Sequence, residues 1–598
     1  MLSVGMLLAF QEAAPAAEAP QARGWDDFPV FLWREKYAGK PLPEELVEPF
    51  GGVILMREED STWARERGLS YLVWNVAGRD ALHLDADEAW NARVEQWIQT
   101  HDEKLLVREP CLNDPKTLEQ LCATLDATIA KHGEHPGLGF VLGDEVGLTP
   151  NGDPFDLCRC GFCEAKWKEY AQKNGLPERA PLTDEVRLAL LEDDFSSLGA
   201  WLARRRFDRE LMTKLLQALS ERAHHSSPSS PVGLLGIAGS PFGGIDLADG
   251  LPFLDFVECY PVGDTRQLVS SSPRRELRSP HGYSFGPRPR AALATVFVGE
   301  ESPDGAAKKV WEHWLRGSNS LVLWSDQALA ADPARAARLA QAVAEVRRIG
   351  RDFPRLLSPN FERIALVHDA DSSALSWLKD ALLDGVTWPR RRSGFQEQNG
   401  TREKSVRRWL RELEDAGAFP ASVPLSRLGE SCFGGCRTLV LAHLLVLGPE
   451  DVSQLEHQLD YGATLVVDGP LGWVDRNGRP WKEDVLQRLR ARAPDQVRTT
   501  VDDLKAFLST WKPVLTAEEG SVSWLVNLRG TQSITHMPPD ALVVALPYFL
   551  HEDGARSKPL RLQVQPPPGK RLEWIHPADG RELPSGDAAV LLLHAEER

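Results

Sequence analysis

The stretch GLGFVLGDE, residues 137–145, is a short apolar run that ends on two carboxylates, and its pattern recurs through the first half of the chain. Segments with helical periodicity, such as KTLEQLCATLDATIAKHG and DGAAKKVWEHWLRG, separate these runs. Short buried strands that alternate with helices are typical of parallel β/α units. Seven further runs follow the pattern: PVFLWR (29–34), GGVILMR (51–57), SYLVWN (70–75), VGLLGIAG (232–239), LDFVECYP (254–261), ALATVFVGE (292–300) and SLVLWSD (320–326).

Eight such strands within residues 25–355 predict an α/β fold of the (β/α)8 TIM-barrel type with insertions. The largest insertion, at about 146–230, directly follows the fourth strand. The apolar run KLLVREP (104–110) would be a ninth strand, and we interpret it as an extended excursion before the helix that leads to the fourth strand.

The pattern changes after a long helix at about 333–350. Three more buried-strand runs separated by helices predict a smaller, flavodoxin-like α/β domain with an open parallel sheet at 360–512. The region 514–598 has apolar runs with Pro and Gly between them and no helical period, which predicts a small C-terminal β-sandwich. The three α/β runs are RIALVHDAD (363–371), RTLVLAHLLVLG (437–448) and GATLVVDGP (462–470).

Size and charge limit the classes of partner. The 598 residues exceed what one compact core accommodates. The net charge of −17 would repel phosphate backbones, so we expect no nucleic-acid partner. No apolar run approaches the roughly 18 residues that a membrane span needs, so we expect no membrane partner either.

The N-terminal segment, residues 1–24, has its own composition. MLSVGMLLAF is followed by an Ala/Pro-rich stretch, which resembles the second half of a signal peptide, although no Lys or Arg precedes the apolar run. The segment favours an exported or periplasmic protein. A disordered tail on a cytoplasmic protein is the alternative.

Two strand ends carry candidate catalytic acids. The fourth strand is expected to end in Gly143-Asp144-Glu145 and the seventh in Gly299-Glu300-Glu301. Functional side chains of a barrel lie at the carboxyl ends of its strands. A retaining glycosidase needs one acid/base and one nucleophile about 5 Å apart. The alternative is that these carboxylates only cap helices or pair with Arg.

Aromatic and polar residues accompany the two acids. Trp33, Trp74 and Trp324 lie at or near the ends of the first, third and eighth strands, where indoles could stack on a sugar ring or plug the barrel. Arg108 precedes the helix into the fourth strand and Asn75 ends the third strand, so either could reach a sugar hydroxyl.

Four of the 8 cysteines suggest a metal site. Cys158, Cys160 and Cys163 form a C-x-C-x2-C motif in the large insertion. Zinc in a structural site takes four ligands, and Cys111 is the candidate for the fourth. The alternative is a set of buried thiols without a metal.

Several stretches resemble glycoside hydrolase family 42 (GH42), the family of β-galactosidases. REPCLNDPKTLEQLCATLDATIAKHGEHPGLGFVLGDE resembles the segment that leads to the acid/base, and LCRCGFCEAKWKEYAQKNG resembles the cysteine-containing insert. TVFVGEESP with GSNSLVLWSDQALA resembles the nucleophile strand and the eighth strand, and GATLVVDGPLG resembles a strand of the trimerisation domain. The resemblance implies a glycosidase with a carbohydrate substrate and a homotrimer.

The resemblance also implies roles for individual residues. It makes Glu145 the acid/base, Glu300 the nucleophile and Trp324 a sugar platform, and it places Arg108 near the nucleophile. Cys111, Cys158, Cys160 and Cys163 would surround zinc.

The chain departs from the family at two positions. Asp144 stands where the family has Asn before the acid/base, and an ionised Asp accepts a hydrogen bond but cannot donate one. Glu301 competes with Glu300 for the nucleophile role. The alternative function is therefore a catalytically diverged barrel that binds carbohydrate or serves in assembly.

Overall fold

A computed structural model describes most of the chain. The described residues are 24–37, 42–57, 60–132, 137–237, 239–246, 252–259, 291–352, 364–393, 399–415, 420–429, 437–499 and the strands between 515 and 595. The N-terminal segment 1–23 lies outside them. No helix in the described part is both long and apolar enough to span a bilayer.

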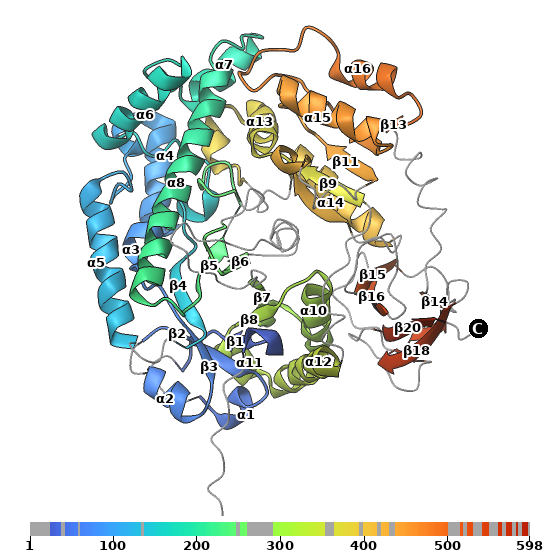
Figure 1. The fold of residues 1–598 in the computed structure, drawn as a ribbon. Helices are drawn as coiled ribbons and strands as arrows, with labels where there is room; N and C mark the ends of the chain where they lie inside the picture. Colours follow the sequence, from blue (N-terminus) through green and yellow to red (C-terminus); the bar gives the residue numbers. More distant parts are fainter. Residues whose placement is uncertain are drawn as a thin grey trace, which may run out of the picture.

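Eight parallel strands close into a barrel, with β1 paired to both β2 and β8 (Figure 1). This confirms the predicted TIM barrel. The strands are β1 (Val30–Leu32), β2 (Gly51–Leu55), β3 (Ser70–Val73), β4 (Gly139–Asp144), β5 (Val232–Ile237), β6 (Phe256–Cys259), β7 (Ala291–Phe297) and β8 (Ser320–Trp324).

Strand alternation builds the barrel interior. Successive side chains of a strand point to opposite faces, so every second residue faces inward. The inward residues form one apolar layer with a member from every strand, while their neighbours pack outward against the helices. The layer consists of Phe31, Ile54, Leu72, Val141, Leu235, Phe256, Leu293 and Val322.

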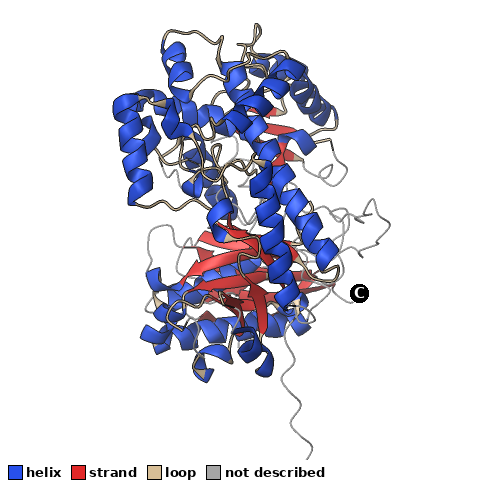
Figure 2. Cartoon of the chain, turned by 90° about the vertical axis from the view of Figure 1, so that its left-hand side faces the viewer, coloured by secondary structure: helices blue, strands red, loops and turns tan. Residues whose placement is uncertain are grey.

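Helices cover the outside of the barrel and surround its strands (Figure 2). They include α2 (Asp60–Glu66), α3 (Arg79–Leu82), α5 (Pro115–His132), α10 (Pro303–Leu315), α11 (Asp326–Ala331) and α12 (Pro333–Asp352). Helix α4 (Glu88–Thr100) packs instead against the insertion that follows β4. The insertion after β4 contributes α6 (Gly161–Asn174), α7 (Thr183–Leu191) and the long α8 (Leu198–Ser226).

One local prediction is confirmed and one needs correction. The run KLLVREP does not join the barrel, as expected; it begins in a 3-10 helix, η2 (Glu103–Leu106), and continues as irregular chain before α5. Strand β7 ends at Phe297, before the predicted Gly299-Glu300-Glu301, because the chain turns there into a 3-10 helix, η4 (Val298–Glu300).

A second parallel sheet follows the barrel, with strand order β10-β9-β11-β12-β13. The order is that of flavodoxin-like sheets, which agrees with the predicted type of domain. The sequence predicted only three of the five strands. Its strands are β9 (Ile364–His368), β10 (Ala421–Pro424), β11 (Thr438–Ala442), β12 (Thr464–Asp468) and β13 (Val497–Arg498), and its helices are α13 (Ala370–Ala381), α14 (Thr401–Asp415), α15 (Pro449–Asp460) and α16 (Val485–Arg492).

Buried charges join the α/β part to the insertion. Asp371 of α13 accepts hydrogen bonds from Arg206 and Arg209 of α8, at 2.7 and 2.8 Å. Arg476 lies 3.1 Å from the same carboxylate. Burial would raise the pKa of Asp371, but the guanidinium groups hold it below the ordinary value.

The C-terminal strands form two antiparallel sheets, in line with the predicted β-sandwich. The three-stranded sheet contains β14 (Leu515–Ala517), β17 (Leu560–Val564) and β19 (Glu582–Leu583). The four-stranded sheet contains β15 (Ser523–Arg529), β16 (Ala541–Tyr548), β20 (Ala589–Ala595) and β18 (Lys570–His576).

Candidate active site

The candidate site lies at the carboxyl ends of the barrel strands. One step above the apolar layer, strand alternation directs Trp33, Trp74, Glu258, Thr295 and Trp324 inward. In TIM-barrel enzymes the active site lies at this end of the strands. The mouth therefore combines indoles with buried acids.

Glu145 occupies a turn at the end of β4. Its backbone has a left-handed φ of 51°, and its N–H donates to the Leu235 carbonyl of β5 at 3.1 Å. The side chain is 28% exposed, so a ligand at the mouth could reach it. His83 Nδ1 lies 3.6 Å from Glu145 Oε2, and His83 Nε2 lies 3.0 Å from Asp85.

Gly236 of β5 makes room for the β4 acids. Its φ is +63°, and a Cβ there would lie 2.5 Å from Asp144 Oδ1 and 2.9 Å from Glu145 Cγ. Both the backbone conformation and the space require glycine at this position.

Glu258 of β6 is a buried acid that the sequence analysis did not identify as a site residue. It is 1% exposed; Thr295 donates its hydroxyl at 2.5 Å and Gly236 donates its N–H. Burial raises the pKa of Glu258 to about 7, although the two hydrogen bonds favour the ionised form and lower it. The charge of Glu145 raises the pKa further. The sequence does contain a sign of this residue, because Glu258 is an acid at an inward-facing position of the otherwise apolar run LDFVECYP.

Asp144 has a similar environment. Burial raises its pKa to about 7, with further contributions from the charges of Glu145 and Glu258. The charge of His83 and the nearby indole N–H of Trp74 act in the opposite direction. Asp144 and Glu258 thus both have pKa values raised to about 7.

The three predicted tryptophans meet at the mouth. The Trp33 ring centroid lies 4.8 Å from that of Trp324 and 5.6 Å from that of Trp74, with the second pair edge to face. Trp33 is 6% exposed and belongs to the barrel core, whereas Trp74 and Trp324 are half-buried. Only the latter two present surface on which a sugar could stack.

Asn75 lies beside Trp74 in a left-handed conformation, with φ of 50°. Its amide nitrogen and oxygen are inaccessible to solvent and have no hydrogen-bond partner within the described chain. Buried amides are normally satisfied, so this side chain is suited to a ligand that both donates and accepts.

Glu300 lies on η4, directly after β7, and its side chain is exposed. It makes no hydrogen bond or ion pair with any described residue, and its role as nucleophile stays a prediction. Glu301 faces α10, where its carboxylate lies beside Gly305. Burial lowers the pKa of Lys308, and the charge of Glu301 is among the effects that oppose this fall.

Arg108 lies beside the loop that follows Glu145. It is fully buried, and its guanidinium donates to the carbonyls of Pro110 at 2.6 Å and Gly147 at 3.3 Å. Burial lowers the pKa of Arg108 to about 10. The side chain therefore stabilises this loop, and its predicted place near the nucleophile stays a prediction.

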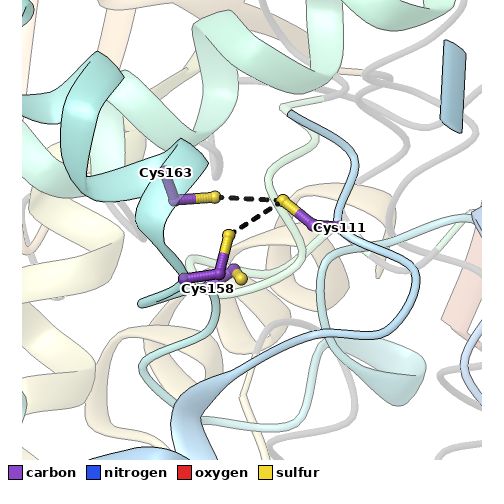
Figure 3. A group of neighbouring side chains, drawn as sticks. Cys111, Cys158 and Cys163 are labelled. Carbon is purple, nitrogen blue, oxygen red and sulfur yellow. Dashed lines mark hydrogen bonds between the residues drawn. The ribbon is translucent and has the colours of Figure 1, made fainter. Parts of the chain in front are cut away.

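The four predicted cysteines come together beside Arg108. The sulfurs of Cys111, Cys158, Cys160 and Cys163 lie within 4.8 Å of one another, and Figure 3 shows those of Cys111, Cys158 and Cys163 turned inward. Four sulfurs at Zn–S distances of about 2.3 Å in a tetrahedron would be about 3.8 Å apart, so the set fits zinc.

Backbone and amide N–H groups surround these sulfurs. Arg108 N donates to Cys158 and Asn113 N to Cys111, both at 3.3 Å, and Asn113 Nδ2 donates to Cys163 at 3.1 Å. Such donors stabilise thiolates, and metal-ligating groups commonly have them.

Comparison with known proteins identifies the architecture. No protein-family model and no curated protein matches the sequence. Among solved structures, Gan42B, a GH42 β-galactosidase from G. stearothermophilus, is 12% identical, with a TM-score of 0.62 over 96% of this chain and 99% of that chain.

Two further structures extend the likeness. A GH42 exo-carrageenase from Bacteroides ovatus is 12% identical, with a TM-score of 0.58 over 95% of this chain and 83% of its own. A β-galactosidase from Halorubrum lacusprofundi is 14% identical, with a TM-score of 0.57 over 96% and 98%. The likeness confirms the resemblance to GH42 at the level of the fold.

Proposed function

We propose that the chain is a retaining glycoside hydrolase that acts on a β-galactoside or a related glycan. The observation that carries the proposal is the half-exposed Glu145 at the end of β4, beside buried acids and indoles. The fold shared with β-galactosidases and an exo-carrageenase supports a carbohydrate substrate.

Glu145 is the acid/base of this proposal. It protonates the glycosidic oxygen as the bond to the anomeric carbon breaks, and it later takes a proton from the attacking water. Glu300 remains the predicted nucleophile, which would form and then release the glycosyl ester.

Three residues of the mouth serve substrate binding. Trp74 and Trp324 supply apolar ring surface, and the unpartnered amide of Asn75 can bond a sugar hydroxyl in both directions.

Turnover of aryl glycosides tests the proposal, with a panel that includes β-galactosides and NMR detection of the first anomer released. We expect a retained anomer from the wild type and a large loss of turnover in Glu145→Gln and Glu300→Gln. Glu301→Gln is the matched control, because that side chain faces α10. An inverted product would exclude the retaining mechanism.

A carbohydrate-binding protein without turnover is the second candidate. Asp144, which stands where the resembled family has Asn before the acid/base, favours it. Sugar binding by calorimetry without hydrolysis of any panel member would support this candidate over the first.

We further propose that the four cysteines hold a structural zinc ion, which would lock the insertion onto the barrel loop that contains Cys111. Metal analysis of the purified protein should give one zinc per chain. A homotrimer is also proposed from the family resemblance, and light scattering would measure it.

A further inference from the structure

The segment after β3 brings His83 to the turn that contains Glu145. Val76 and Ala77 continue the pairing with β4, since their N–H groups donate to carbonyls of that strand at 2.9 and 3.3 Å. Helix α3 follows, and His83 directly after it donates its backbone N–H to the carbonyl of Arg79 at 3.0 Å. Backbone bonds therefore fix the position of His83 independently of its ring.

A further backbone bond joins the same segment to the chain beyond Glu145. The N–H of Gly147 donates to the carbonyl of Leu82, the residue before His83, at 3.2 Å. Leu82 also packs beside Gly143, where an added Cβ would lie 3.3 Å from Leu82 Cδ1. The segment thus contacts the chain both before and after Glu145.

The His83 ring has an acceptor at each nitrogen. Nδ1 lies 3.2 Å from the backbone carbonyl oxygen of Glu145 and 3.6 Å from its Oε2, and Nε2 lies 3.0 Å from Asp85 Oδ1. A carbonyl and an ionised carboxylate accept hydrogen bonds but donate none. Both ring nitrogens therefore carry hydrogen when both bonds form, and the ring is then an imidazolium ion.

The charged groups around this ring come from β4, α3 and the segment after α3. Glu145 and Asp144 lie at the end of β4, and Arg79 of α3 donates to Asp85 Oδ1 at 2.8 Å. The ring belongs to a buried residue, whereas the side chains of Asp85 and Arg79 are exposed. His83 therefore lies between an exposed acid that orients it and the partly exposed Glu145.

The contact matters because Glu145 has a left-handed backbone. Residues other than glycine seldom adopt a positive φ, and the φ of Glu145 is 51°. The N–H of Glu145 donates to Leu235 of β5, and its carbonyl faces Nδ1 of His83. Bonds on both sides of the residue fix the direction in which its side chain leaves the turn.

We propose that His83, oriented by Asp85, is a positioning residue for Glu145, whose turn it holds through a hydrogen bond from Nδ1–H. The inference rests on the proposed function, in which Glu145 is the acid/base. His83 itself exchanges no proton with the substrate. A misplacement of about 1 Å can cost an enzyme about 100-fold in rate, so loss of this bond should be measurable in turnover.

A pair of amide variants separates the two ring nitrogens. The amide nitrogen of Asn is as many bonds from Cα as Nδ1 of His, and that of Gln is as many as Nε2. His83→Asn therefore keeps a donor for Glu145, whereas His83→Gln keeps one for Asp85. We expect kcat/KM on aryl glycosides with poor leaving groups to be about tenfold lower in His83→Gln than in His83→Asn.

The leaving group distinguishes positioning of Glu145 from general damage to the fold. The difference between the two variants should shrink on good leaving groups, because the departing oxygen then needs little proton transfer from Glu145. A purely structural role would lower turnover of both kinds of substrate alike. Equal kcat/KM of the two variants on the poor leaving group would overturn the proposal.

His224 provides a matched control. Its Nε2 lies 2.8 Å from Asp255 Oδ2, so it is paired with a carboxylate as His83 is. Asp255 directly precedes β6 and lies at the amino end of that strand, opposite to the mouth. His224→Gln should therefore retain the kcat/KM of the wild type.

Nuclear magnetic resonance of the full-length protein with 15N-labelled histidine tests the bond without substrate. Buried N–H groups in hydrogen bonds are protected from exchange with water, so their protons stay visible. We expect an Nδ1–H signal near pH 6 that His83→Gln removes and His224→Gln leaves. A His83 ring without hydrogen on Nδ1 would overturn the proposal. A wild type that shows the signal but turns over no glycoside would instead refute the proposed function, and the bond to the turn would still stand.

Discussion

The N–H of Gly236 donates a hydrogen bond to the carboxyl group of Glu258. This bond joins β5 to β6 at the level where β4 presents Asp144 and Glu145. A single backbone group thus holds one buried acid while the absent side chain leaves space for another. The arrangement of the mouth depends on this glycine.

Replacing Gly236 should therefore damage both stability and the site. We expect Gly236→Ala to cost about 3 kcal/mol or more, because its Cβ would overlap Asp144 and the left-handed φ adds about 1 kcal/mol. Gly175 has nearly the same φ, +65°, with nothing near its Cβ position. Gly175→Ala is the matched control in urea unfolding, and equal losses would show that no overlap occurs.

The pH dependence of stability should report Glu258. Its folded pKa of about 7 lies above the ordinary 4.5, so stability is complete below about pH 4.5 and falls as pH rises through 7. Glu258→Gln removes this loss. The unfolding free energy of the variant minus that of the wild type should therefore increase by about 3 kcal/mol between pH 4.5 and pH 8. Parallel curves for the two proteins would contradict the raised pKa.

The cysteine cluster should contribute to stability through its metal. We expect a chelator to lower the Tm of the wild type, and Cys160→Ser to lose zinc and several kcal/mol of stability. Cys122→Ser is the control, because Cys122 lies on α5 outside the cluster. A Cys160→Ser protein with full zinc content would contradict the four-sulfur site.

The junction between α8 and α13 should be sensitive to loss of one acid. Asp371→Ala leaves Arg206 and Arg209 without their buried partner, and we expect a loss of about 3–5 kcal/mol. Asp460→Ala breaks a solvent-exposed pair with Arg492 and should lower the stability far less, because solvent screens exposed ion pairs. Thermal unfolding of both variants measures the difference, and similar losses would refute a structural role for the junction.

The sequence predicted the architecture well because buried parallel strands form continuous apolar runs. All eight barrel strands were located this way, as were β9, β11 and β12. Strands β10, with the sequence ASVP, and β13, with two residues, were missed because neither is an apolar run. They lie at the edges of the sheet, where a strand has only one neighbouring strand and can be short or less apolar.

The site was predicted less completely, for physical reasons. Glu145 and the four cysteines follow from local sequence, since a strand end and a tight motif fix their positions. The burial of Arg108 and its hydrogen bonds to the carbonyls of Pro110 and Gly147 could not be predicted, because they depend on the irregular chain after η2 and on the loop after Glu145. Glu258 was missed because its role depends on Gly236 and Thr295, which only the closed barrel brings to it.

The most direct test of the central claim, that Glu145 is the acid/base, compares wild type and Glu145→Gln on aryl β-galactosides with good and poor leaving groups. A general acid contributes about 10²–10⁴-fold where the departing oxygen needs a proton. We predict a loss of at least about 100-fold in kcat/KM on the poor leaving group and a much smaller loss on the good one. Equal activity of wild type and variant on the poor leaving group would contradict the account.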